Sequence, residues 1–165
     1  MIALENVLVA TDFGSASDTA VRYGRALAER FGAKLHVLHV AADAYLNAAM
    51  AYGYASVPVN VQEEIELNAR RQLGALLSDE DRQTLHATAT LVRHNTPAAA
   101  IIEYAKSHNI HLIVLGTHGR GALAHLFMGS VAERVVRLAP CPVLTVRHPE
   151  QEFVLPDALL AVSRA

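Results

Sequence analysis

Two uninterrupted apolar runs constrain the fold of this chain more than any other feature. They are NVLVAT at Asn6–Thr11 and LIVLG at Leu112–Gly116, and both are rich in β-branched residues. Such runs are typical of parallel strands that are covered on both faces. Similar runs at Lys34–Val40, Ala87–His94 and Pro142–Arg147 predict three further strands. The sequence therefore predicts a parallel sheet of five strands.

Helical patterns lie between these strands. The predicted helices run from Ser15 or Ser17 to Arg30, from Val61 to Leu77, from Thr96-Pro97 to His108 and from Ser130 to Leu138. Strands that alternate with helices through right-handed crossovers form an open sheet with helices on both faces. The predicted fold class is therefore α/β.

Apolar residues spaced three and four apart predict the buried face of each helix. The predicted inward residues are Ala20, Tyr23, Gly24, Leu27, Phe31, Ile65, Leu73, Leu76, Leu77, Ile101, Ile102, Ala105, Val131, Val135 and Leu138. The hydroxyl of Ser15 or Ser17 is expected to cap the first helix, and Gly32 follows its end. Thr96 is expected to cap the helix that begins at Pro97.

The length of 165 residues fits one ordinary domain. We expect residues 1–147 to form that domain and 148–165 to be a C-terminal extension. The segment Ala42–Pro58, which contains three tyrosines, is long for a connection between a strand and a helix. It is either a functional loop or a plain surface excursion, and the sequence does not choose between them.

Composition and charge argue against several classes of partner. The formal charge is −2 and the pI about 6.5, so no basic surface for nucleic acid is expected. The start, MIALENVLVATD, predicts a strand rather than a signal peptide. No apolar run approaches the roughly 20 residues that span a bilayer. The single Cys141 excludes an internal disulfide and is expected to be a small packed residue, which fits a cytoplasmic protein.

Four of the nine glycines lie in GTHGRGALAHLFMGS, residues Gly116–Ser130, immediately after an apolar run. Glycines at 116, 119 and 121 allow positive φ and a close approach to an anion. Gly129 and Ser130 begin a helix, whose first N–H groups and dipole attract anions. The Ser130 hydroxyl, Arg120 and His125 can add contacts to a phosphate. The alternative is a surface loop with no ligand.

The predicted topology places a second segment beside these glycines. In an open parallel sheet, ligands bind beyond the carboxyl ends of the strands, where the strand order reverses. The two most apolar strands are the expected central pair, and Ala10, Thr11 and Asp12 end the first of them. Asp12 has an alternative role as a cap of the helix that follows. His36 and His39 are expected on opposite faces of their strand, which argues against a metal pair.

The glycine spacing resembles that of a known family. Gly116-x2-Gly119-x9-Gly129-Ser130 matches the G-2x-G-9x-G-[S/T] signature of the nucleotide-binding branch of the universal stress protein family. The segments NVLVATDFGSASDTAVRYGRALAERFGAKLHVLHV, VRHNTPAAAIIEYAKSHNIHLIVLGTHGRG and GSVAERVVRLAPCPVLTVR also resemble that family. The resemblance covers nearly all of residues 1–147. It implies an adenine-nucleotide α-hydrolase-like sheet of strand order 3-2-1-4-5.

The resemblance also implies a site for ATP with Mg²⁺. By its pattern, Asp12 lies near the ribose or the metal ion, and Val40 offers a backbone contact to adenine. The phosphate-binding positions are Gly116, Gly119, Gly129, Ser130 and Val131. Together with the flanking residues, the predicted site comprises Ala10, Thr11, Asp12, Val40, Gly116, Gly119, Arg120, Gly129, Ser130 and Val131. Gly14 and Asn95 depart from the family pattern, which commonly has serine and glycine there.

The sequence favours nucleotide binding over turnover. It has neither the lysine of the G-x-x-x-x-G-K-[S/T] pattern nor a clear catalytic base, so at most slow ATP hydrolysis is expected. The expected function is that of an ATP-binding regulatory protein of the stress response, with an unknown protein partner. The alternative is a dimeric chaperone-like or interaction factor whose nucleotide site is vestigial. The last strand, Pro142–Arg147, is the expected surface of a homodimer.

Overall fold

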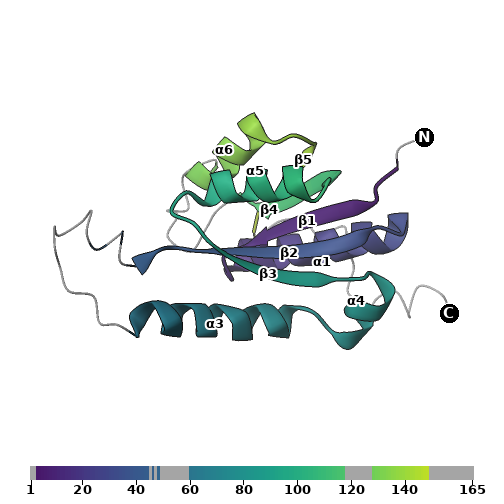
Figure 1. The fold of residues 1–165 in the computed structure, drawn as a ribbon. Coiled ribbons are helices and arrows are strands. Elements are labelled where there is room, and N and C mark those ends of the chain that lie inside the picture. Colours follow the sequence, from purple (N-terminus) through teal and green to yellow (C-terminus); the bar gives the residue numbers. More distant parts are fainter. Residues whose placement is uncertain (1–2, 45, 47, 49–59, 118–127, 149–165) are drawn as a thin grey trace.

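The computed structural model of the chain describes residues 3–44, 46, 48, 60–117 and 128–148. Its centre is a parallel sheet of order β3-β2-β1-β4-β5 (Figure 1). The strands are β1 (Asn6–Thr11), β2 (Lys34–Ala41), β3 (Thr88–Arg93), β4 (Leu112–Gly116) and β5 (Val143–Val146). The predicted strand order is confirmed.

Helices cover both faces of this sheet, as predicted. They are α1 (Ser15–Phe31), α3 (Val61–Leu76), α4 (Asp79–Thr84), α5 (Pro97–Ser107) and α6 (Ser130–Leu138). Figure 1 shows α5 and α6 on one face and α1 and α3 on the other. Val7 and Val9 pack toward α1, whereas Leu8 packs toward α5, because successive side chains of a strand point to opposite faces. All three are fully buried, so β1 is the centre of both core layers.

Close packing of α1 on the sheet requires a glycine. A Cβ built on Gly24 would lie 2.2 Å from the Cγ2 atom of Val9. Real Cβ atoms do not approach so closely, so helix and strand can touch here only through a residue without a side chain. The helix ends as predicted at Gly32, which has a φ of 66°.

Three apolar side chains predicted to face inward are exposed instead. The exposed fractions are 48% for Phe31, 40% for Ile65 and 56% for Leu138. Phe31 and Leu138 are the last residues of α1 and α6. In α3 the buried residues are Gln62, Ala69 and Leu73, so the inward row does not include Ile65.

A buried polar side chain lies at the start of α3. Gln62 is only 5% exposed. Its Oε1 accepts the N–H of Ala44 at 2.9 Å, and its Nε2 donates to Glu66 Oε1 at 3.0 Å. Gln62 therefore ties the start of α3 to the segment that follows β2. A prediction based on apolar spacing alone cannot find this contact.

The predicted helix caps need correction, because neither helix is capped by the side chain that was expected. The N-cap of α1 is Gly14, and Ser17 instead accepts the Gly14 N–H at 3.0 Å from inside the helix. Thr96 precedes Pro97 as expected, but its side chain makes no capping hydrogen bond. The short helix α4 was not predicted. Ser78 caps it by accepting the N–H of Asp81 at 3.0 Å.

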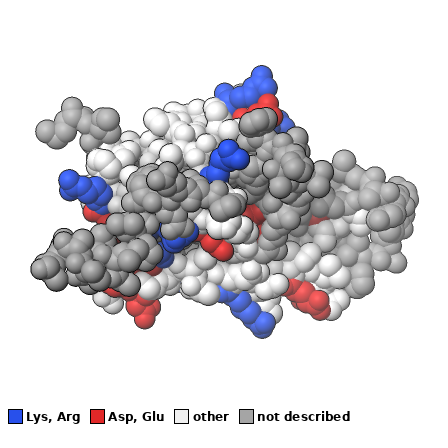
Figure 2. Space-filling view, turned by 180° about the vertical axis from the view of Figure 1, so that it is seen from behind, with Lys and Arg blue, Asp and Glu red and all other residues white. Residues whose placement is uncertain are grey.

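The surface agrees with the charge expected from the sequence. On the described part of the face in Figure 2, basic and acidic side chains are interspersed and form no continuous basic patch. None of the helices in the described ranges combines the length and apolar composition needed to cross a lipid bilayer.

Candidate functional site

A cavity of about 470 Å³ opens at the carboxyl ends of the central strands. Its position is where the strand order reverses, since β1 pairs with β2 on one side and with β4 on the other. Ligands of open α/β sheets bind at this kind of crevice, and the volume is within the usual range for small-molecule sites.

The cavity brings together the predicted site residues from four segments that are distant in the sequence. Every predicted residue inside the described ranges lines it: Ala10, Thr11, Asp12, Val40, Gly116, Gly129, Ser130 and Val131. Gly119 and Arg120 lie outside the described residues, as do His125 and most of Ala42–Pro58.

A hydrogen-bond network shapes the turn between β1 and α1. The Thr11 hydroxyl accepts the N–H of Phe13 at 3.0 Å and bonds to the Ser17 hydroxyl at 3.1 Å. The Ser17 hydroxyl donates in turn to the Gly14 carbonyl at 2.8 Å. Phe13 has a φ of 62°, a conformation that is a genuine outlier for a bulky residue. The turn is therefore specified by several contacts at once.

Asp12 holds the backbone just before α1 and also lines the cavity. Its Oδ1 accepts the N–H of Gly14 at 3.1 Å, which closes a turn immediately before α1. A Cβ on Gly14 would lie 3.2 Å from the same Oδ1 atom. The glycine that departs from the family pattern thus leaves more room around this carboxylate than serine would.

The N-terminus of α6 forms the opposite wall. Gly129 is its N-cap, with φ −73° and ψ 153°, and no side chain within the described ranges caps the helix. The Gly129 N–H instead donates to the Thr117 carbonyl at 2.6 Å. The first N–H groups of a helix have no partner inside it. Ser130, Val131 and Ala132 line the cavity, so the N–H groups at this helix end would be available to an anion bound there.

The reason for glycine at position 116 differs from the predicted one. Among the described glycines only Gly32 has a positive φ, so Gly116 does not make a left-handed turn. A Cβ on Gly116 would instead lie 2.9 Å from the backbone carbon and the Cβ of Ala16. Gly116 is needed because the end of β4 touches the first turn of α1.

The sequence did not predict the apolar part of the lining. Leu38, Pro97, Ile101, Leu115 and Met128 all contribute to it. Ordinary core positions supply most of these side chains, and nothing in their local pattern distinguishes the ones that face the cavity. A flat apolar group bound here would be in contact with aliphatic side chains on several sides.

His39 was also missed as a lining residue. It precedes Val40 on β2, and its ring centroid lies 4.3 Å from that of Phe13. Its Nδ1 lies 2.8 Å from the Thr11 carbonyl oxygen. His36 on the same strand instead contacts the Tyr104 hydroxyl at 3.1 Å. The two histidines therefore contact different residues, which agrees with the expected opposite orientations of their side chains.

The described lining offers one carboxylate for a cation, that of Asp12. Within the described ranges, no group of three or more His, Cys, Asp or Glu side chains could hold a metal ion. A Mg²⁺ ion in this cavity would therefore need phosphate oxygens as ligands beside Asp12, which is the usual arrangement for Mg²⁺ with nucleotides.

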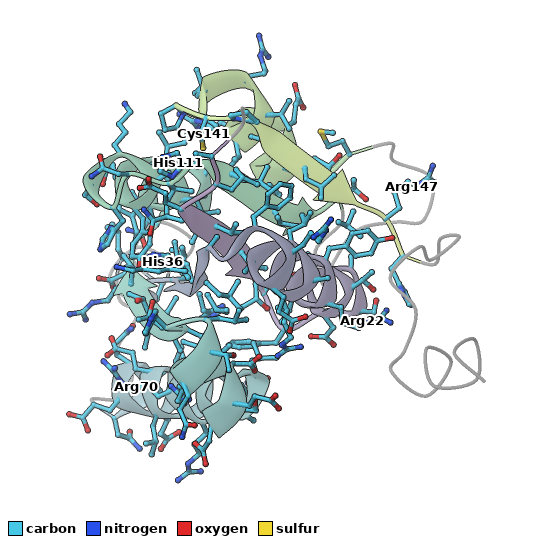
Figure 3. The ribbon with its side chains drawn as sticks, turned by 90° about the vertical axis from the view of Figure 1, so that its right-hand side faces the viewer. Arg22, His36, Arg70, His111, Cys141 and Arg147 are labelled. Carbon is cyan, nitrogen blue, oxygen red and sulfur yellow. The ribbon has the colours of Figure 1, made fainter. Side chains whose placement is uncertain are left out.

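The residues with shifted pKa values lie away from the cavity. Burial lowers the pKa of His36, as do the nearby charges of His108 and Lys34. Burial also raises the pKa of the Cys141 thiol, which favours its role as a packed residue. Figure 3 looks onto the edge where the strands begin, and it shows both residues there, opposite the carboxyl ends.

Comparison with known proteins agrees with this geometry. The profile of the universal stress protein family matches residues 3–147. Universal stress protein YxiE of Bacillus subtilis (strain 168) is 30% identical over 144 residues, which cover 86% of this chain and 97% of that protein. Universal stress protein A homolog 1 of Coxiella burnetii is 34% identical over 149 residues, covering 86% and 95%.

A solved structure shows the same arrangement of strands and helices. The universal stress protein UspA from Lactobacillus plantarum superposes with a TM-score of 0.70 at 27% identity, over 89% of this chain and 100% of that one. The fold is thus of the adenine-nucleotide α-hydrolase-like class. Within this class, the chain belongs to the universal stress protein family.

Proposed function

We propose that the protein binds an adenine nucleotide, ATP together with Mg²⁺, in the cavity at the carboxyl ends of β1 and β4. The N-terminus of α6 carries this proposal: no side chain within the described ranges caps it, and its residues Ser130, Val131 and Ala132 line a cavity with apolar walls. Helix N-termini bind phosphate and other anions. Two proteins of the same fold were solved with adenine nucleotides, a universal stress protein with cAMP and one from Archaeoglobus fulgidus with dAMP.

We assign different residues of the cavity to the phosphate, the adenine and the ribose of the nucleotide. Ser130 and Val131 would donate N–H groups to phosphate, and Gly129 brings them to the cavity. The Val40 backbone would contact adenine against the apolar lining. Asp12 would bind the ribose or, with phosphate oxygens, the Mg²⁺ ion. Gly119 and Arg120 complete the proposed set.

A regulatory role suits this site better than rapid turnover. Fast phosphoryl transfer needs a positioned water and stabilisation of the charge on the transferring group. Apart from Arg120, which lies outside the described residues, the proposed site has no lysine or arginine, and its one carboxylate is that of Asp12. We propose a cytoplasmic stress-response protein with at most slow hydrolysis, whose nucleotide occupancy changes its contacts with a partner protein.

Ser130→Pro tests the proposed phosphate site. Proline is favoured at the first position of a helix, and Gly129 already has the extended conformation that a residue before proline prefers. The helix should persist while one N–H donor is lost. Since a hydrogen bond to a charged group contributes about 1.5–3 kcal/mol, ATP affinity measured by calorimetry with Mg²⁺ should fall about tenfold to a hundredfold.

Ser130→Ala is the matched control, because it removes the hydroxyl and keeps the N–H. Its loss of affinity should be clearly smaller than that of Ser130→Pro. Equal affinities of the wild-type and proline proteins would contradict the proposed phosphate site. A wild-type protein that releases no heat with ATP and carries no nucleotide after purification would favour an interaction factor with a vestigial site.

We also propose that the protein forms a homodimer through β5, within the segment Pro142–Arg147. Within the described residues β5 pairs only with β4, so its outer edge has no partner strand there. Val143→Lys should shift the protein from dimer to monomer in sedimentation, because a lysine on an edge strand opposes pairing. Val136→Lys is the control, since Val136 is 45% exposed but lies on α6. A dimer unaffected by Val143→Lys would place the interface elsewhere.

A further inference from the structure

The turn between β1 and α1 holds an aromatic residue in a conformation that aromatic residues seldom adopt. Phe13 has a φ of 62°. A single residue of this kind costs free energy, and such residues persist only where the surrounding contacts specify them. They occur most often at functional sites, and this one directly follows Asp12 at the cavity. The question is which contacts hold it.

His39 supplies two of these contacts from the neighbouring strand. Its ring lies 4.3 Å from the Phe13 ring at an interplanar angle of 33°. Its Nδ1 lies 2.8 Å from the Thr11 carbonyl oxygen. A carbonyl oxygen only accepts hydrogen bonds, so Nδ1 carries the proton and donates it. His39 thus contacts the residues on both sides of Asp12.

Two further hydrogen bonds, one to Thr11 and one to Asp12, shape the turn. The Thr11 hydroxyl accepts the Phe13 N–H at 3.0 Å, and Asp12 Oδ1 accepts the Gly14 N–H at 3.1 Å. With Phe13 left-handed, these two bonds close together and the Asp12 carboxylate lines the cavity. The φ angle of Phe13 lies between Asp12 and the Gly14 N–H. If Phe13 relaxed to a negative φ, the Gly14 N–H would therefore move and its bond to Asp12 Oδ1 would have to change.

We propose that His39 is a positioning residue for nucleotide binding: it holds Phe13 in the left-handed conformation and so keeps the Asp12 carboxylate in the cavity. This role rests on the proposed nucleotide site for its effect on affinity. The effect on the turn itself does not depend on any ligand. His39 also lines the cavity, and the proposed role is the one it exerts through Phe13 and Thr11.

Replacement of His39 is expected to weaken ATP binding, because Phe13 could then leave its strained left-handed conformation. His39→Ala should lower ATP affinity about tenfold with Mg²⁺ present, measured by calorimetry. His39→Asn keeps an N–H near the Thr11 carbonyl, and His39→Phe keeps a ring against Phe13. Each should lose less affinity than the alanine variant, and either can replace it if the alanine variant does not fold.

Phe13→Gly distinguishes positioning from general structural support. Glycine adopts a positive φ without strain, so it no longer needs His39 to hold the turn. His39→Ala should therefore cost much less affinity in the Phe13→Gly protein than in the wild type, less than about threefold. Equal losses in both backgrounds would overturn the proposal.

Two measurements without nucleotide separate this inference from the proposed function. The wild type, His39→Ala, Phe13→Gly and the double variant should show coupling between His39 and Phe13 when their free energies of unfolding are measured in urea. Nitrogen NMR should show His39 protonated on Nδ1 near pH 8, and an Nε2-protonated ring would contradict the proposal. A wild-type protein that binds no adenine nucleotide would overturn the proposed function, and the unfolding cycle and the tautomer would then decide the role of His39 in the turn.

Discussion

Gly24→Ala is expected to lower the free energy of unfolding by about 1–3 kcal/mol, although alanine is the better helix former. The new methyl group would lie 2.2 Å from Val9 Cγ2. Val9 is fully buried on the central strand and its χ1 is stiff, so it cannot turn away. Helix α1 would have to move off the sheet. Urea unfolding at one fixed protein concentration measures the change.

Gly74→Ala is the matched control. Gly74 also lies inside a helix, α3, but a Cβ built there meets nothing within 4 Å. This substitution should raise the free energy of unfolding by about 0.5–1 kcal/mol, because glycine is the poorer helix former. Opposite signs at the two positions would show that contact with Val9 decides the first result. Stabilisation by both substitutions would contradict the close packing of α1 on β1.

Asp81→Asn is expected to destabilise the protein by about 2–3 kcal/mol at pH 7. The Asp81 side chain is 7% exposed, and its carboxylate accepts hydrogen bonds from Arg25 Nε and Nη2 at 2.7 and 3.0 Å. It also accepts the Ser78 N–H at 2.8 Å. Asparagine would turn an N–H₂ group toward one of these donors. Breaking a buried pair costs about 3–5 kcal/mol, and the partial exposure of Arg25 reduces this figure.

The same substitution should change the acid sensitivity of the fold. Burial alone would raise the Asp81 pKa, but the hydrogen bonds from Arg25 and Ser78 outweigh it and hold the pKa below the ordinary value of 3.8. The stabilisation by ionised Asp81 is therefore complete above the unfolded-state value. It is lost as the pH falls below 3.8 through the folded-state pKa.

The difference in stability between wild type and Asp81→Asn should accordingly be constant near neutral pH and shrink in acid. Unfolding followed by circular dichroism from pH 7 downward measures both proteins. Glu80→Gln, an exposed neighbour on α4, is the control and should change stability by less than about 0.5 kcal/mol. A difference that stays constant through pH 3 would show that the charge of Asp81 does not stabilise the fold.

Most of the architecture follows from local patterns. Continuous apolar runs predict buried strands such as Leu112–Gly116, and Gly32 ends α1 as predicted. The strand order came from the resemblance to a family, since alternation of strands and helices alone allows more than one order. The glycine spacing also located the end of β4 and the start of α6, which line the cavity at Gly116 and Gly129.

The remaining features depend on which distant segments meet. Gly116 is required by its contact with Ala16 rather than by its own backbone conformation. Gln62 is buried although it is polar, and its Oε1 accepts the N–H of Ala44. In each case the decisive neighbour is far away in the sequence, so no local pattern contains it.

The sequence was thus sufficient for the α/β class, the positions of the strands and several of the residues that line the cavity, because burial periodicity and helix ends are properties of short segments. The tertiary structure was needed for the turn around Asp12, which His39 reaches from the next strand. It was needed equally for the ion pair of Arg25 with Asp81, whose partners are 56 residues apart. Such contacts form only when the sheet brings separate segments within a few ångströms of each other.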